Sequence, residues 1–175
     1  MAEAKEPRRV WIGDVRPTTP DRVSDAKAVV GHAVVVSADI YADGHDELAA
    51  RLWWRSAGAD GWRASAMVPI GNDRWQGTWT PSELGQHEFA IQGWVDAWVT
   101  WKHHVRAKLD AGVDFADALN DGTLLLEEVR VTPLGEAYER EIVALRAGDP
   151  APALAASALP GPLRAVWPIG WTGGR

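Results

Sequence analysis

Hydrophobic and polar residues alternate with a period of two over much of residues 8–112. Such alternation is typical of strands that bury one face in a core. Clusters of turn residues, such as ADGHD, GADG and IGND, separate the alternating runs. We therefore predict six or seven strands in an antiparallel β-sandwich, the last of them over residues 98–109. The inward positions of two strands are Val34, Val36, Ala38 and Ile40, and Leu48, Ala50, Leu52 and Trp54.

The hydrophobic period changes after Gly112 and becomes helical. Leu134, Tyr138, Ile142 and Leu145 recur at the spacing of one helix face. A short helix can follow before Pro160, and the remaining residues are rich in glycine and proline. The predicted organisation is a β-sandwich over 8–112, a helical segment over 113–160 and an irregular tail over 161–175.

The run QGWVDAWVTWKHHVRAKL, residues 92–109, concentrates tryptophan, histidine and cations. In a strand, His103 and His104 point to opposite faces, so they cannot hold one metal ion between them. We predict no metal site, and core positions for Trp54 and Trp101. The tryptophans expected to point outward, and therefore the candidates for a ligand site or a protein interface, are Trp53, Trp94 and Trp98.

Composition narrows the classes of partner. The formal net charge of −6 argues against nucleic acid, which needs a basic face. No apolar run approaches the roughly 20 residues of a membrane helix, and residues 1–10 lack the apolar core of a secretory signal. The chain has no cysteine, so thiol chemistry is excluded. These features predict a cytoplasmic protein without a membrane partner.

Four quoted stretches together resemble one enzyme family. They are WIGDVRP (11–17), AKAVVGHAVVVSADIYADGHDELAARLWWR (26–55), DRWQGTWTPSELGQHEFAIQGW (73–94) and VTWKHHVRAKLDAG (99–112). They resemble the N-terminal domain of bacterial α-1,4-glucan:maltose-1-phosphate maltosyltransferases, which are members of the α-amylase superfamily. The resemblance implies an immunoglobulin-like sandwich followed by part of a helical insertion. It also implies a role in homodimerisation and in supporting a catalytic domain.

The resemblance does not bring a catalytic site with it. A (β/α)₈ barrel needs roughly 250 residues, and the chain ends where the family's barrel would start. Retaining glycosyl transfer needs a carboxylate nucleophile and an acid/base, and no barrel motif of the superfamily is present. We therefore expect no transferase activity, no catalytic residue and no cofactor in this chain.

Two other functions remain open. The pattern W-x-G-T-W-x-P-x-x-x-G-x-x-x-F-x-I, residues 75–91, also resembles sandwich modules of starch-branching and debranching enzymes. Some of these bind α-glucan, so a maltooligosaccharide-binding module is the alternative function. An independent small enzyme ranks well behind, because no convergent set of titratable residues is evident.

Overall fold

The computed structural model describes residues 10–21, 24–130 and 138–156. The chain divides into two compact units, with the break between Val95 and Asp96. The first unit holds six strands: β1 (Val10–Arg16), β2 (Val34–Ala42), β3 (Leu48–Ser56), β4 (Arg63–Gly71), β5 (Arg74–Trp79) and β6 (His87–Val95). The second holds four helices: α1 (Ala97–Ala111), α2 (Ala116–Arg130), α3 (Glu139–Arg146) and α4 (Ala151–Ala155).

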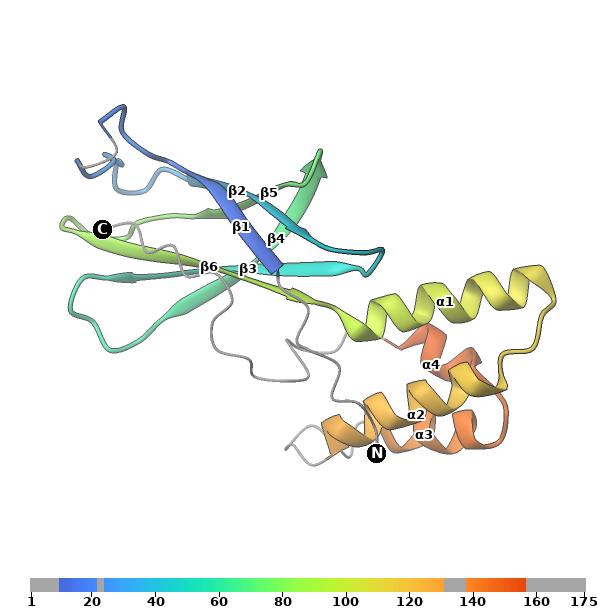
Figure 1. The fold of residues 1–175 in the computed structure, drawn as a ribbon. Helices are drawn as coiled ribbons and strands as arrows, with labels where there is room; N and C mark the ends of the chain where they lie inside the picture. Colours follow the sequence, from blue (N-terminus) through green and yellow to red (C-terminus); the bar gives the residue numbers. More distant parts are fainter. Residues whose placement is uncertain (1–9, 22–23, 131–137, 157–175) are drawn as a thin grey trace, which may run out of the picture. The chain divides into compact units, whose positions relative to one another are not determined.

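The strands form an antiparallel array in the order β1-β2-β5-β4-β3-β6. Strand β4 belongs to both layers: Arg63–Met67 pair with β3, and Val68–Gly71 pair with β5. Figure 1 shows β3 and β6 side by side, facing the layer that contains β1, β2 and β5. The order β1-β2-β5-β4 is that of strands A, B, E and D of an immunoglobulin constant-type domain, and β3-β6 that of C and F. The predicted immunoglobulin-like, mainly β fold followed by short helices is confirmed.

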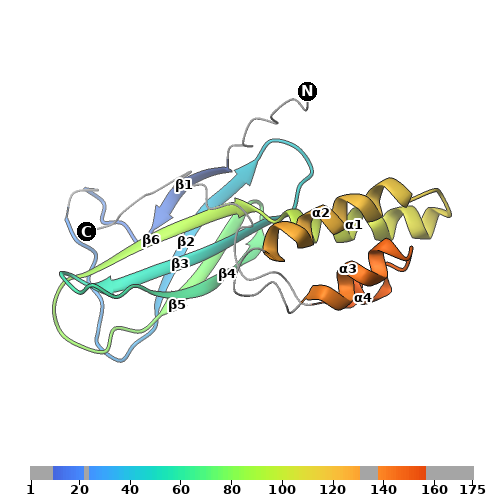
Figure 2. The same cartoon turned by 90° about the horizontal axis from the view of Figure 1, so that it is seen from below.

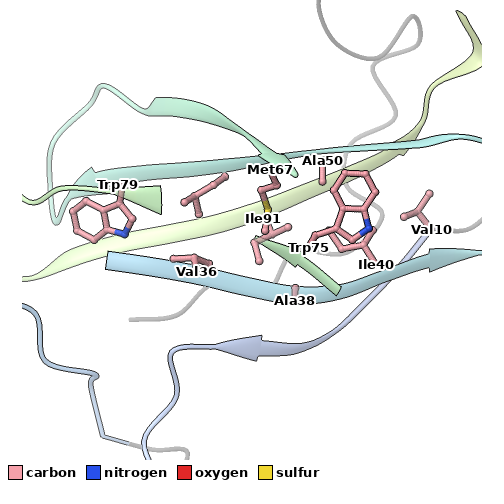
Figure 3. Packing of buried hydrophobic residues seen from close by; sticks show 10 residues of the cluster. Val10, Val36, Ala38, Ile40, Ala50, Met67, Trp75, Trp79 and Ile91 are labelled. Carbon is pink, nitrogen blue, oxygen red and sulfur yellow. The ribbon is translucent and has the colours of Figure 1, made fainter. Parts of the chain in front are cut away.

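The core of the sandwich consists of the inward positions of both layers. The alternation predicted for β2 and β3 is confirmed, because Val36, Ala38 and Leu52 are wholly buried. Figure 3 shows Val36, Ile91 and Met67 meeting between the ribbons of the two layers. Trp75 and Trp79 of β5 both point into this core. Trp54 is half-buried against it and stacks on Trp79, with ring centroids 6.2 Å apart.

The strand predicted over 98–109 is wrong, because these residues form helix α1. The Asp96 side chain caps the helix by accepting a hydrogen bond of 3.0 Å from the Val99 amide. Gly112 ends it in the left-handed conformation, with φ of 64°. The sandwich therefore ends at Val95, not at 112. Among the described residues no strand pairs with β6 on the side away from β3.

The helical unit has a core of its own. Helix α1 packs on α2, α2 on α3, and α3 on α4, and Figure 2 shows α1 beside α2 and α3 beside α4. Its fully buried members include Trp98, Val105, Leu126 and Ile142. The predicted helical stripe is confirmed at Ile142 and Leu145, which are buried, whereas Leu134 lies outside the described residues. The tail predicted as irregular, 161–175, also lies outside them.

Candidate binding face of the sandwich

Trp53 and Trp94 lie on the same outer face, as their strand parity predicts. Trp53 of β3 pairs with Ala90 of β6, and Trp94 pairs with Ala49. The Arg51–Gln92 pair lies between these two pairs on the same face. This register therefore places the two indoles on either side of Arg51 and Gln92. Both indoles are half-buried, so each keeps part of its surface in solvent.

Arg51 occupies the space between the two tryptophans. Its guanidinium carbon lies 5.5 Å from the centroid of the Trp53 ring and 5.6 Å from that of Trp94. Both distances are within the range of a cation–π interaction. Opposite Arg51, the Gln92 side-chain oxygen accepts a hydrogen bond of 3.0 Å from Trp53 Nε1. We call Arg51, Trp53, Gln92 and Trp94 the Trp–Arg–Trp row. Its contacts hold both indoles in defined orientations.

The same face continues toward the far end of β3 with a second arginine. The Arg55 guanidinium forms an ion pair of 2.8 Å with Glu88, and its carbon lies 4.6 Å from the centroid of the Trp62 ring. Arg55 also donates a hydrogen bond of 3.1 Å to the carbonyl oxygen of Ala59. The outer face of β3 and β6 therefore combines aromatic rings with fixed hydrogen-bonding groups, a composition that suits contact with a protein or a sugar.

The prediction that Trp98 points outward is wrong. Trp98 lies in α1 and is fully buried, stacked on Trp101 with ring centroids 4.6 Å apart and planes 14° apart. Lys102 Nζ lies 5.5 Å from the centroid of the Trp98 ring and donates a hydrogen bond to the carbonyl oxygen of Ala156. Burial lowers the pKa of Lys102, and the charge of Arg106 adds to this shift. Trp98 is thus a core residue of the helical unit. Trp101 is buried as predicted, but in the helical core.

The opposite sheet carries exposed aromatics that the sequence analysis did not single out. Trp11 of β1 pairs with Tyr41 of β2, and their side chains are 49% and 48% exposed. The signal for Trp11 was its alternation with the inward Val10 and Ile12. This outer face is otherwise polar at its centre, where Arg74 Nη1 lies 2.8 Å from Asp39 Oδ1 and 2.9 Å from Asp14 Oδ2.

The charges of this cluster stabilise one another. The hydrogen bond with Asp39 raises the pKa of Arg74. A hydrogen bond from Arg16 lowers the pKa of the Asp14 carboxyl, and the charges of Arg16 and Arg74 act in the same direction. The cluster joins β1, β2 and β5 across three strands, so it serves to hold this sheet together.

The two adjacent histidines considered as metal ligands, His103 and His104, are both exposed on α1. Glu127 forms an ion pair with Arg146 on the neighbouring helix. Within residues 10–21, 24–130 and 138–156, no group of three or more histidine or carboxylate side chains is placed to hold a metal ion. None of the described helices is both long and apolar enough to cross a membrane.

Comparison with known proteins places the chain in a family. A sequence profile described as alpha-1,4-glucan:maltose-1-phosphate maltosyltransferase, domain N/S, matches residues 8–165. The maltosyltransferase of Chlorobaculum tepidum is 39% identical over 120 residues, which cover 69% of this chain and 18% of that protein. Maltosyltransferase 1 of Streptomyces coelicolor is 35% identical over 138 residues, which cover 78% of this chain and 20% of that protein.

The matched region is a small part of each relative. A third protein of the same name, from Cereibacter sphaeroides, is 40% identical over 104 residues, 59% of this chain and 18% of its own length. The chain thus spans about a fifth of the length of the curated relatives it matches. The immunoglobulin-like sandwich, the helices that follow it and the match over residues 8–165 together show that this chain belongs to the N/S domain family of the α-1,4-glucan:maltose-1-phosphate maltosyltransferases.

Proposed function

We propose that this chain is a non-catalytic accessory domain of a cytoplasmic, maltosyltransferase-type enzyme that elongates α-glucan. In this role it supports the catalytic domain and takes part in homodimerisation. The single observation that carries the proposal is the Trp–Arg–Trp row on the outer face of β3 and β6. Tryptophan and arginine are the residues most enriched among the energetically dominant positions of protein interfaces.

The absence of catalysis is part of the same proposal. The relatives are named for maltosyl transfer, and about four-fifths of each lies outside the match with this chain. Glycosyl transfer needs two carboxyl groups flanking the reacting bond, one of them with a raised pKa. We assign that pair of carboxyl groups to the part of such an enzyme that this chain does not match.

Association can be measured on the purified chain by sedimentation velocity over a range of concentrations. We expect self-association, or association with the part of the Streptomyces coelicolor relative that this chain does not match. Trp53→Ala and Trp94→Ala should each weaken that association at least about tenfold, the effect of losing about 1.4 kcal/mol.

The matched control is Trp11→Ala, which removes a half-exposed tryptophan from the opposite sheet. It should leave the association unchanged. A chain that stays monomeric and does not bind the unmatched part of the relative would contradict the proposal, as would equal effects of the three substitutions.

One observation favours a second function, the binding of α-glucan on the same face. The two outward indoles are flanked by Gln92 and Arg51, whose side chains can hydrogen-bond sugar hydroxyls. Titration with maltoheptaose, followed by calorimetry and tryptophan fluorescence, tests it. Saturable binding that Trp94→Ala abolishes would establish this function, whereas no heat up to millimolar sugar would exclude it.

A further inference from the structure

A recess of about 850 Å³ lies at one end of the sandwich, away from the residues of the Trp–Arg–Trp row. Its described lining includes residues 13–15 of β1, residues within 17–19 and 24–30 of the connection before β2, and residues within 81–86 of the connection between β5 and β6. The two connections are joined by a hydrogen bond of 2.9 Å from the Gly31 amide to the Pro81 carbonyl oxygen and by a side-chain hydrogen bond of 3.2 Å from Gln86 to Asp25. The volume is within the range of roughly 300–1,000 Å³ that small-molecule sites occupy.

The residues lining the recess include aromatic side chains at the end of the core. Phe89 is half-buried, and the imidazole of His87 lies 5.1 Å from the Trp79 ring, measured between centroids. Trp79 is 7% exposed, and its buried Nε1 has no hydrogen-bond partner among the described residues. A buried donor without an acceptor costs about 1–3 kcal/mol. An oxygen atom of a ligand bound in the recess is one way to satisfy it.

The charges around the recess restrict the ligand. Among the described residues that line it, Asp25 and Glu83 face one cation, Lys27, while a third carboxylate, Asp14, is paired with Arg16 and Arg74. Such a set disfavours phosphates and other anions, because like charges repel over these distances. The remaining polar lining consists of hydroxyl and amide groups: Thr18, Thr19, Ser24 and Gln86. Aromatic rings together with carboxylate, hydroxyl and amide groups suit a neutral polyhydroxylated molecule.

We propose that the recess is a binding site for a neutral oligosaccharide, separate from the outer face of β3 and β6. The choice of an α-1,4-linked glucan as its ligand rests on the function proposed above. The sugar's apolar face packs against the aromatic side of the recess, and its hydroxyl groups donate to Asp25 and Glu83. A phosphorylated sugar is rejected by the same carboxylates.

The test is a calorimetric titration of the purified chain with maltotriose, with maltose 1-phosphate as the charged probe. Ala26 and Ala28 are exposed residues that line the recess, so Ala26→Trp fills it without changing the core. We expect saturable binding of maltotriose, a loss of at least about tenfold in affinity in Ala26→Trp, and weaker binding of maltose 1-phosphate. Ala107→Trp, at an exposed position of α1, is the matched control and should bind as the parent does.

Other outcomes would overturn the site. They are unchanged affinity in Ala26→Trp, no binding of maltotriose up to millimolar concentration, or tighter binding of maltose 1-phosphate. Circular dichroism checks that Ala26→Trp folds, and Ala28→Phe is the second filling variant if it does not. If Trp94→Ala loses binding and Ala26→Trp does not, the sugar binds at the Trp–Arg–Trp row and not in the recess. Self-association is measured without sugar, so failure at the recess leaves the proposed accessory role standing.

Discussion

Gly122 of α2 lies directly against the indole of Trp101 in α1. A methyl group at Gly122 would approach three atoms of that ring more closely than 3.0 Å. The same indole donates a hydrogen bond from Nε1 to the carbonyl oxygen of Ala118, one turn earlier in α2. The glycine therefore allows the two helices to approach closely enough for the Trp101 hydrogen bond to form.

Gly122→Ala should destabilise the helical unit by about 1–3 kcal/mol, because the added methyl group overpacks a buried contact. Helix propensity alone predicts the opposite sign, since alanine is favoured over glycine by about 1 kcal/mol in a helix. The measurement is urea unfolding followed by circular dichroism. Asn120→Ala, at an exposed position of the same helix, is the control and should be neutral or slightly stabilising. A more stable Gly122→Ala protein would show that the helices can separate without cost.

Trp98→Ala should destabilise the protein by about 3–5 kcal/mol, because it empties a fully buried position next to Trp101. Trp94→Ala should cost clearly less, since Trp94 is half-buried on an outer face. Thermal and urea unfolding of both variants makes the comparison. Equal stability of the two variants would contradict the assignment of Trp98 to the core.

Arg51→Met keeps most of the length of the side chain but removes the charge shared by Trp53 and Trp94. We expect a loss of about 1 kcal/mol in the free energy of unfolding, from two partly exposed cation–π contacts. The emission of the outward tryptophans should also shift to the red as they become more solvated. Arg63→Met, at an exposed position of β4, is the control. Identical results for the two variants would mean that Arg51 does not order the row.

The pKa of Asp14 is lowered in the folded protein, mainly by the hydrogen bond from Arg16 and also by Arg74. A carboxyl group with a depressed pKa in the folded state stabilises the protein above its unfolded pKa of about 3.9. That contribution is lost as the pH falls through the lower, folded-state value. Asp14→Asn should therefore reduce stability at pH 7 but have little effect at strongly acid pH.

Urea unfolding at neutral and acid pH measures this difference, and added salt should shrink it because the group is exposed. Asp60→Asn, at an exposed loop position, serves as the control. The same loss of stability at both pH values in Asp14→Asn would exclude an electrostatic role for this carboxylate.

Strand parity was sufficient to assign the inner and outer faces of β2, β3 and β6. Val36, Leu52 and Ile91 are buried, and Trp53 and Trp94 point outward, as the alternation predicts. Because side chains in a strand alternate between two faces, burying one hydrophobic face fixes the orientation of every residue in that strand. The orientation can therefore be predicted from the strand's own sequence. What parity could not supply is the neighbour of each outward residue. That Arg51 lies between Trp53 and Trp94 depends on the register of β3 against β6.

Residues 98–109 show where the pattern was ambiguous. Alternation assigned Trp101 and Val105 to one strand face, and both are indeed buried, but a helix buries them equally well at a spacing of four. The local signals that favour the helix were Asp96 at its start and Gly112 at its end. Trp98 is the residue whose environment changes with this choice, from an outer face to the centre of a core.

By itself, the sequence determined the β-sandwich, its buried faces, the family and the outward orientation of Trp53 and Trp94, because these depend on short-range periodicity and on motifs. The tertiary structure decided that residues 97–111 are helical, that Trp98 is buried, and that Gly122 lies against Trp101. It also formed the recess, whose two hydrogen bonds between connections join residues 50 and 61 positions apart in the sequence. These features arise from packing between distant segments, which the local pattern of one segment does not encode.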